Sequence, residues 1–307
     1  MQSIIQYIIR PRTTLFYVFM TIAHFLPERL HLQIEYRMKM GKRLNLDKPQ
    51  TFCEKLQWLK LYYRKPEYTS MVDKLAVKRI VAEKIGDEYV IPVLGVWDKP
   101  EEIDFDSLPN RFVLKTSHGG GSNGVLICKD KKSLNRGMVI KRMQKAMKQN
   151  IYKVNLEWPY KNVPRKIFAE QFVEDSSEET DLPDYKWYCF NGEPKFCQVI
   201  KNRRVHETID FFDTEWKHQE FIGLNPNVEH ADVIPPRPLH LERQINLARV
   251  LSTNIPFARV DLYEINGKIY FGEITFYPAS GMGRFRPERY DLILGKMLTI
   301  PGETSGT

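Results

Sequence analysis

A lysine and a run of glycines stand together between two apolar segments at 113–127, VLKTSHGGGSNGVLI. The stretch matches three catalytic patterns at once: the G-x-G-x-x-G-x-V loop of protein kinases, the G-x-S-x-G turn of hydrolases and the H-G-G-G segment of lipases. The two hydrolase patterns belong to different loops of one fold, yet here they share Gly120 and Gly121. A kinase also needs H-R-D-x-x-x-x-N and D-F-G, which the chain lacks. A P-loop is excluded as well, because Val125 follows Gly124 in place of lysine.

These loops have one physical property in common. Glycines lack a Cβ, so their backbone N–H groups can approach phosphate oxygens closely. Lys115 stands at the end of a predicted strand, where its ammonium can reach the same phosphates, and Ser117 and Ser122 add hydroxyl donors. A flexible hairpin loop is the alternative interpretation. Three consecutive glycines cost folding entropy, which favours a phosphate-binding loop over a plain turn.

Two carboxylates are expected to meet farther along the chain, in the segment 258–275. An Asn-Gly pair at 266–267 is a strong hairpin signal, and its turn brings Asp261 near Glu273 across the ladder. Thr275 shares a face with Glu273, because side chains two residues apart point the same way. Two facing carboxylates repel unless a cation separates them, and Mg²⁺ commonly binds one or two carboxylates together with phosphate oxygens. The segment therefore predicts a Mg²⁺ site; a solvated face of charge pairs is the alternative.

Elements that could position these groups follow from periodicity and turn signals. Helices are expected at 29–40, 51–63, 70–85, 135–149, from the proline-rich loop at 234–238 to about 252, and at 287–298. Strands are expected at 90–96, 112–115, 125–128, 166–173, 184–190, 195–201, 258–264 and 268–275. Hairpins mixed with helices predict α+β layers and argue against one doubly wound sheet.

Composition narrows the class of protein. The 307 residues are 42% hydrophobic and 27% charged, as in ordinary folded chains. The 46 basic and 38 acidic residues give a net charge of +8, which favours anionic partners. Nucleic acid is disfavoured, because no recognised nucleic-acid-binding motif is present. Four cysteines without metal spacing fit a reducing cytoplasm: Cys53, Cys128, Cys189 and Cys197.

The apolar run 13–26, TTLFYVFMTIAHFL, is too short to span a bilayer and is interrupted by His24. It has no signal-peptide cleavage site. Two interpretations stay open: a helix packed on the core, and an interfacial helix held at a membrane surface with help from nearby arginines.

Four segments carry a resemblance to a known family: DKLAV at 73–77, FVLKTSHGGGSNG at 112–124, DYKWYCFNGEPKF at 184–196, and RVDLYEINGKIYFGEITFYPASGMGRF at 259–285. From about residue 30 to 300 the chain resembles the TupA-like ATP-grasp family, named for teichuronopeptide synthesis. The resemblance implies an α+β ATP-grasp fold, in which two subdomains clasp ATP. The expected division is a helical N-terminal extension at 1–65, the N-terminal and small glycine-loop subdomains at 66–165, and a C-terminal subdomain with the metal site at 166–307.

The resemblance also implies roles, carried over by position. Lys74 and Lys115 match the two ATP lysines, and the glycine loop is expected to close over the phosphates. The predicted nucleotide contacts are Lys74, Lys115, Ser117, Gly119, Gly120, Gly121, Ser122, Lys186 and the adenine hinge of Glu170, Gln171, Phe172 and Val173.

On the metal side, Asp261 and Glu273 match the two Mg²⁺ carboxylates of the family. Arg259 and Lys115 are the expected catalytic cations, and Arg284 is a further candidate. The usual Glu-x-Asn pattern is Glu273-Ile274-Thr275 here, and a threonine hydroxyl binds Mg²⁺ more weakly than an amide oxygen. The place of a second metal ion is therefore open.

The implied activity is an ATP-dependent carboxylate–amine ligase that works through an acylphosphate. The expected partners are ATP, Mg²⁺, an amine or amino acid, and an acidic or amino sugar of capsule, O-antigen or other surface polysaccharide. Lys201, Arg203, Arg204, Arg284 and Arg286 are candidates to hold the acidic acceptor, with a solvated basic face as the alternative. A cytoplasmic location is expected, with possible peripheral contact at the inner membrane face. The alternatives are a sugar kinase, a glycosyltransferase-like enzyme and a membrane-surface scaffold.

Overall fold

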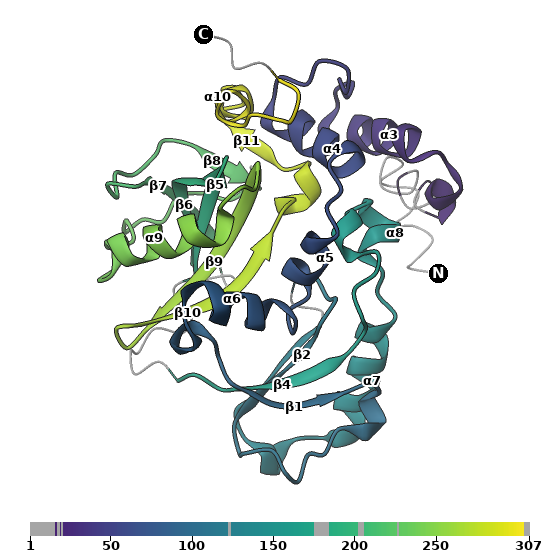
Figure 1. Cartoon of the computed structure of the whole chain (residues 1–307), viewed down its shortest axis with the longest axis vertical. Helices are drawn as coiled ribbons and strands as arrows, with labels where there is room; N and C mark the ends of the chain where they lie inside the picture. The colour runs from purple at the N-terminus through teal and green to yellow at the C-terminus, as the bar shows by residue number, and fades with distance from the viewer. Residues whose placement is uncertain are drawn as a thin grey trace.

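The computed structural model describes residues 16, 19, 21–121, 124–174, 184–201, 206–225 and 227–303. Figure 1 shows two antiparallel sheets set apart from each other, with helices α5 and α6 between them. α5 spans Glu67–Val72 and α6 spans Val77–Ile85. This mixture of helices and antiparallel sheets confirms the expected α+β class.

The smaller sheet has four strands in the order β1-β4-β2-β3. Its strands are β1 (Val93–Trp97), β2 (Phe112–Thr116), β3 (Val125–Cys128) and β4 (Ile167–Gln171). Helix α7 (Arg136–Met147) covers one face and packs Val139 and Met143 against Phe112 and Leu114. Because β4 pairs with both β1 and β2, the predicted boundary between residues 165 and 166 falls before the last strand of this sheet.

The larger sheet has five strands in the order β10-β9-β5-β6-β7. Its strands are β5 (Asp184–Phe190), β6 (Glu193–Lys201), β7 (Thr208–Asp213), β9 (Phe257–Ile265) and β10 (Lys268–Thr275). Both predicted Asn-Gly hairpins are confirmed, and each turn residue has the positive φ that such a turn requires. Helix α9 (Leu241–Ser252) packs on one face, where Trp187 Nε1 donates a 3.1 Å hydrogen bond to Gln244.

The N-terminal helices belong to the core of the larger sheet. α3 spans Glu28–Met40, and α4 spans Phe52–Tyr62 behind a capping box formed by Thr51 and Glu54. Phe52 is fully buried, and its ring lies 4.8 Å from that of Phe257 on β9. Two further strands, β8 (Ile222–Leu224) and β11 (Arg284–Arg286), pair with each other, and helix α10 (Arg289–Met297) packs on α4.

Shorter helices complete the described chain: α8 (Ile151–Asn155) and the 3₁₀ turns η1 (Ala23–Phe25), η2 (Asp87–Tyr89), η3 (Pro100–Glu102), η4 (Lys131–Ser133), η5 (Trp158–Tyr160) and η6 (Pro278–Gly281). All four cysteines are buried free thiols. Within the described residues, no helix combines the length and apolar character needed to cross a bilayer. Much of the apolar run at 13–26 lies outside the described residues; of the part described, Phe19 and Ala23 are buried and Phe25 is exposed.

The predicted single helix at 70–85 is wrong. The structure divides it at Asp73, where α5 ends, and α6 begins at Val77. The buried Asp73 carboxylate accepts hydrogen bonds from the backbone N–H groups of Leu75 and Ala76, at 2.9 and 3.2 Å. A side chain that takes backbone donors in this way competes with the helix, which the apolar periodicity did not reveal. The break carries Lys74, one of the predicted ATP lysines.

A single added methyl group is expected to test how tightly α10 packs on α4. A Cβ at Gly295 would lie 2.2 Å from the backbone oxygen of Gln50 and 2.8 Å from the backbone nitrogen of Phe52. Gly295→Ala should therefore lower the free energy of unfolding by about 1–3 kcal/mol or more, measured by urea denaturation. Lys296→Ala, at the exposed next position, is the control and should change it by less than about 0.5 kcal/mol. Equal effects of the two substitutions would contradict this packing.

Candidate active site

The acidic hairpin brings its two carboxylates together, as expected: Asp261 on β9 pairs directly with Glu273 on β10. The pairing register shifts between Phe271 and Glu273, so Gly272 is the extra residue of a β-bulge. Phe271 pairs with Leu262, on the opposite face from Asp261, and the bulge is what turns Glu273 away from the Phe271 side. A Cβ at Gly272 would lie 3.0 Å from the Asp261 carbonyl oxygen, which favours glycine at the bulge.

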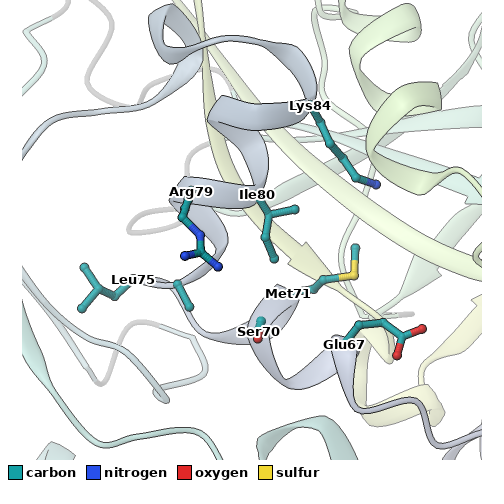
Figure 2. A pocket seen from close by; sticks show the side chains of 8 residues that line it. Glu67, Ser70, Met71, Leu75, Arg79, Ile80 and Lys84 are labelled. Carbon is teal, nitrogen blue, oxygen red and sulfur yellow. The ribbon is translucent and has the colours of Figure 1, made fainter.

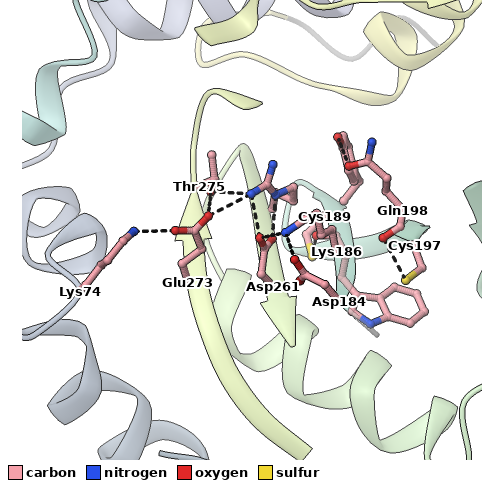
Figure 3. A network of polar contacts seen from close by, with 12 residues as sticks. Lys74, Asp184, Lys186, Cys189, Cys197, Gln198, Asp261, Glu273 and Thr275 are labelled. Carbon is pink, nitrogen blue, oxygen red and sulfur yellow. Dashed lines mark hydrogen bonds and ion pairs between the residues drawn. The ribbon is translucent and has the colours of Figure 1, made fainter. Parts of the chain in front are cut away.

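The polar side chains Asp261, Glu273 and Thr275 lie together on this hairpin (Figure 3), and Arg259 bonds to all three. Its guanidinium donates two hydrogen bonds to Asp261, from Nε and Nη2, both at 2.7 Å. Nη2 also reaches Glu273 Oε1 at 3.2 Å and Thr275 Oγ1 at 3.1 Å. The planar fork of arginine suits this bidentate geometry. All three predicted metal ligands therefore contact one guanidinium group.

Two lysines from other elements complete the cluster. Lys186 on β5 forms ion pairs with Asp261 and with Asp184, the latter at 2.7 Å. Lys74 Nζ donates to Glu273 Oε2 at 2.6 Å. Burial alone would raise the pKa of Glu273, but Lys74 and Arg259 hold it far below its usual range. Burial also raises the pKa of Asp261, against the opposing pull of Arg259 and Lys186.

The cluster is balanced in charge, with three carboxylates facing three cations. Asp184 was missed by the sequence analysis, although its position two residues before Lys186 on a strand places both side chains on one face. Buried charges are tolerated when they are paired and hydrogen-bonded. A neutral, preformed cluster of this kind can exchange partners with a ligand that carries both a cation and anionic oxygens.

A second buried ion-pair group lies on the smaller sheet. Glu170 on β4 is 4% exposed and pairs with Lys115 at 2.5 Å and with Lys78 at 2.6 Å. Burial alone would raise the pKa of Glu170, but the two lysines lower it. Lys78 was missed, although it lies only four residues beyond Lys74, in the first turn of α6. The Glu170 carboxylate is thus directed at two ammonium groups, which was not expected for an adenine-facing residue.

The face of the smaller sheet that carries Lys115 is the one turned away from α7. The register pairs Glu170 with Val93 and Val113, and Val113 with Ile127, so these side chains share that face. Val93 is 37% exposed and Ile127 is 48% exposed. An exposed apolar surface therefore borders the buried Lys115–Glu170 pair.

Two glycines of the loop have a packing reason. A Cβ at Gly119 would lie 2.4 Å from Thr116 Oγ1, and one at Gly124 would lie 2.2 Å from the same atom. Gly121 differs: its φ is +62° and, apart from its chain neighbours, no atom of the described residues lies within 4 Å of its Cβ position. At Gly120 a Cβ would meet Ile151 at 3.0 Å. Close backbone packing thus explains the outer glycines, and freedom of the backbone explains the central one.

The structure describes Ser117 and the predicted hinge residues. Ser117 differs from expectation, because it is buried and its hydroxyl donates to the Pro164 carbonyl oxygen at 2.5 Å. Ser122 lies outside the described residues. The predicted hinge residues Gln171, Phe172 and Val173 line a cavity of about 570 Å³ between the end of β4 and the β9–β10 turn.

Among the described residues, no hydrogen bond or ion pair joins Arg284 to the acidic hairpin. Its guanidinium donates to the backbone oxygen of Lys39, at the end of α3, at 2.6 Å. Arg286 pairs with Glu229 at 2.6 Å. Arg203 and Arg204 lie outside the described residues. Arg284 and Arg286 thus lie against other parts of the surface.

The loop after β10 is bonded to a helix that the sequence analysis did not connect with it. Ala279 and Ser280 have φ values of +48° and +56°, a conformation that side chains seldom adopt. Lys60 on α4 donates to the Ser280 carbonyl oxygen at 2.7 Å and to its hydroxyl at 2.8 Å. Gln57 donates to the carbonyl oxygens of Ser280 and Gly281 at 3.1 and 2.8 Å. Contacts between residues 220 or more positions apart leave no local signal in the sequence.

A further cavity of about 680 Å³ lies along α5 and α6 (Figure 2). Met71, Leu75 and Ile80 form its apolar wall, and Arg79 and Lys84 extend beside it. None of the predicted site residues lines it, although Lys74 lies in the break between the two helices.

A model of the TupA-like ATPgrasp family matches residues 54–299. The match includes the charged cluster, the glycine loop and both sheets. In a comparison with curated proteins, no sequence matches the chain.

Solved structures align with parts of the chain at low identity. D-alanine–D-alanine ligase from Bacillus anthracis, complexed with ATP, has 17% identity over 67% of this chain and 53% of that chain, with a TM-score of 0.39. The Helicobacter pylori enzyme of the same name has 16% identity over 83% and 68%, with a TM-score of 0.44. A RimK domain ATP-grasp protein from Sphaerobacter thermophilus has 12% identity over 75% and 69%, with a TM-score of 0.40. The chain spans about half the length of the first.

A double-mutant cycle tests the packing of the glycine loop. Gly119→Ala should lower the free energy of unfolding by about 1–3 kcal/mol, because its methyl group would overlap Thr116 Oγ1. Thr116→Ala removes that oxygen, which has no hydrogen-bond partner among the described residues. The free energy of unfolding of the double variant should therefore fall by about 1 kcal/mol less than the sum of the decreases in the two single variants. Gly121→Ala is the control, and its effect on the free energy of unfolding should simply add to that of Thr116→Ala. If the effects of Gly119→Ala and Thr116→Ala were also additive, the predicted overlap would be contradicted.

The buried Lys60 should make stability depend on pH. Burial lowers its pKa to about 8, although Glu157 and Glu35 oppose this. Below pH 8 Lys60 stays charged in the folded chain, where burial disfavours the charge. Between pH 8 and 10.5 Lys60 has lost its proton in the folded state but keeps it in the unfolded state. The contribution of Lys60 to the free energy of unfolding should therefore rise by about 1–2 kcal/mol from pH 8 to 10.

Urea denaturation of Lys60→Met across this range is the measurement. The variant should lack the rise that the wild type shows. Lys55→Met, on the same helix, leaves Lys60 in place and should keep the rise. Parallel pH profiles for the wild type and Lys60→Met would show that Lys60 keeps its charge when buried.

Proposed function

Because the chain belongs to the TupA-like ATP-grasp family, we propose that it is an ATP-dependent carboxylate–amine ligase. The charge-balanced cluster of Arg259, Asp261, Glu273 and Lys74 carries the proposal. Each carboxylate is held by a cation, so if Mg-ATP were bound, the cations would be available to phosphate oxygens, and Asp261 and Glu273 would be available to hold the metal ion. Such an exchange would leave few charges unpaired at any stage. Its free-energy cost would therefore be low, because an unpaired charge is what destabilises a buried site.

The nucleotide base is assigned to the smaller sheet. The exposed apolar face around Val93 and Ile127 suits a flat aromatic ring, and Lys115 lies within the same face to meet the phosphates. Gln171, Phe172 and Val173 supply backbone groups beside the nearby cavity. Gly121 provides an unhindered backbone at the tip of the loop. An apolar surface bordered by ammonium groups matches the chemistry of a nucleoside triphosphate.

The donor set of the hairpin fits Mg²⁺, a hard cation that prefers oxygen ligands. Asp261 and Glu273 would hold the ion through carboxylate oxygens, with the Thr275 hydroxyl 3.5 Å from Glu273 Oε1. The low pKa of Glu273 keeps that carboxylate ionised at neutral pH. When bound, Mg²⁺ supplies neutralisation of phosphate charge.

In the proposed reaction, a substrate carboxylate oxygen attacks the γ-phosphorus of ATP, the bond to ADP breaks, and an acylphosphate forms. An amine nitrogen then attacks the acyl carbon and loses a proton, and inorganic phosphate leaves with the C–O bond electrons. Lys115 and Arg259 are proposed to neutralise the transferred phosphoryl group, and Lys74 to hold the adjacent phosphates. No side-chain nucleophile is needed, which agrees with the lack of an activated serine or cysteine at the cluster.

The substrate is proposed to be a uronic acid coupled to an amine or amino acid, or an amino acid coupled to an amino sugar, in surface polysaccharide synthesis. The net charge of +8 supports an acidic partner. The three-part division of the chain and a cytoplasmic location, with possible contact at a membrane surface, are proposed with it.

Thermal unfolding with Mg-ATP, combined with assays of ADP release, tests the nucleotide and metal sites. Mg-ATP should raise the unfolding midpoint of the wild type, and Glu273→Gln should remove that shift because it loses the metal carboxylate. Glu273→Gln and Lys115→Ala should each reduce ATP-dependent turnover at least about 100-fold while the fold is kept. Glu215→Gln, on an exposed loop, is the matched control and should behave as the wild type.

The comparison ligands separate the alternatives. Mg-GTP, a UDP-sugar and anionic lipid vesicles are tested beside Mg-ATP. A midpoint shift with the UDP-sugar or vesicles alone would favour a transferase or a scaffold, and normal turnover in Glu273→Gln would overturn the metal assignment. A stable phosphate ester formed without an amine would identify a kinase.

A further inference from the structure

Three metal-binding side chains meet at the outer edge of the larger sheet. Asp210 lies on β7, the edge strand, and His218 and His230 come from the two segments that follow. Asp210 Oδ1 lies 2.8 Å from His218 Nε2 and 3.1 Å from His230 Nδ1. One carboxylate oxygen therefore faces two imidazole nitrogens.

This group is separate from the proposed ATP site. The strand order places β7 three strands from β9, which at the usual strand spacing is roughly 14 Å. The register also places the two groups on opposite faces: Asp261 aligns through Lys186 and Gln198 with Phe211, the neighbour of Asp210. Asp210 therefore lies on the face that carries α9, and its side chain takes no part in the ATP site.

The geometry points to a binding site for a divalent transition-metal ion of the Zn²⁺ class, held by Asp210, His218 and His230. Zn²⁺ binds histidine nitrogen and carboxylate oxygen at about 2.0–2.2 Å, which in its usual tetrahedral geometry places neighbouring ligand atoms about 3.3–3.6 Å apart. The observed spacings of 2.8 and 3.1 Å are shorter than this, so the side chains must move apart by less than about 1 Å to admit the ion. Two imidazoles with one carboxylate select a borderline metal such as Zn²⁺ over the hard Mg²⁺.

The surroundings fix the ligands and leave one side open. Asp210 is 0% exposed, and its second oxygen accepts a hydrogen bond from the Ala231 N–H at 3.2 Å. The ring of His218 lies 5.3 Å from that of Phe212. The histidine side chains are 28% and 29% exposed, so an ion can enter and keep water in its remaining positions. An oriented, buried carboxylate between two accessible imidazoles is the arrangement expected of a metal site.

One more polar group lies at the site, and another lies on the same face of the strand. The backbone oxygen of Ile209 lies 3.1 Å from His230 Nδ1, so without metal that nitrogen carries the hydrogen and donates it. Thr208, two residues before Asp210 on the same face of β7, is buried, and its hydroxyl has no hydrogen-bond partner among the described residues. A metal ion at His230 Nδ1 would require the tautomer that carries the ring hydrogen on Nε2, and both imidazoles must be uncharged to bind, so acid should weaken binding.

Titration of the full-length, untagged protein with Zn²⁺ tests the proposal, using a chelator to buffer free Zn²⁺ and millimolar Mg²⁺ to occupy hard-cation sites. One equivalent should bind. His218→Gln and His230→Gln should each weaken binding by more than about 100-fold, since even outer-shell partners contribute about 10–100-fold. Glutamine is neutral and can still donate to Asp210, so the fold should be kept; circular dichroism checks this.

His240 provides the matched control. It pairs with a single carboxylate, Glu264, at 2.9 Å, without a second histidine, so His240→Gln should bind Zn²⁺ as the wild type does. Co²⁺, used as a spectroscopic probe, should give visible absorption bands that both site variants lose. The absence of one-to-one binding, or binding that His218→Gln and His230→Gln leave unchanged, would overturn the site and leave a hydrogen-bonded triad. If His240→Gln weakened Zn²⁺ binding to the same extent, the ion would not be held at the proposed site.

Discussion

The guanidinium group of Arg259 is the contact on which the site depends. It is bonded to Asp261, Glu273 and Thr275, and without it two carboxylates would face each other across one rung of a ladder. Like charges directly opposite each other destabilise a sheet. Lys186 and Lys74 add the remaining positive charge from β5 and from the α5–α6 break. The pairing of these strands is therefore compatible with a buried acidic site only because cations from three elements reach it.

The bulge at Gly272 determines which side chains meet. In a regular strand Phe271 and Glu273 would lie on the same face, and the apolar residues would alternate without interruption. The sequence contains the evidence for the change: the buried positions are Ile269 and Phe271 before the glycine, and Ile274 and Phe276 after it. A change of phase at a glycine is the signature of a bulge. The position of Glu273 beside Asp261 was predicted from the turn, but the bulge that aims it was not.

Local signals predicted most of the fold, and the features that were missed are one local helix break and several long-range contacts. The Asn-Gly turns fixed both hairpins, since their chemistry restricts the backbone within four residues. The break at Asp73 was missed because apolar periodicity continues through it, while the side chain captures the backbone donors. Lys60 and Gln57 were missed because their partners at Ser280 lie more than 200 residues away. Family resemblance pointed to Lys74 and Lys115, but not to Lys78, which shares Glu170 with Lys115.

The α5–α6 break connects the two parts of the site through one residue. The backbone N–H of Lys74 donates to the Ser117 carbonyl oxygen at 2.9 Å, two residues before the glycine loop, and its side chain pairs with Glu273 on the larger sheet. Ser117 is fixed in turn by its hydroxyl bond to Pro164. A continuous helix would give its backbone N–H groups to its own carbonyls, and Lys74 could not then bond to Ser117. The helix break that the sequence failed to predict is thus what allows a single lysine to link the glycine-loop strand with the acidic hairpin.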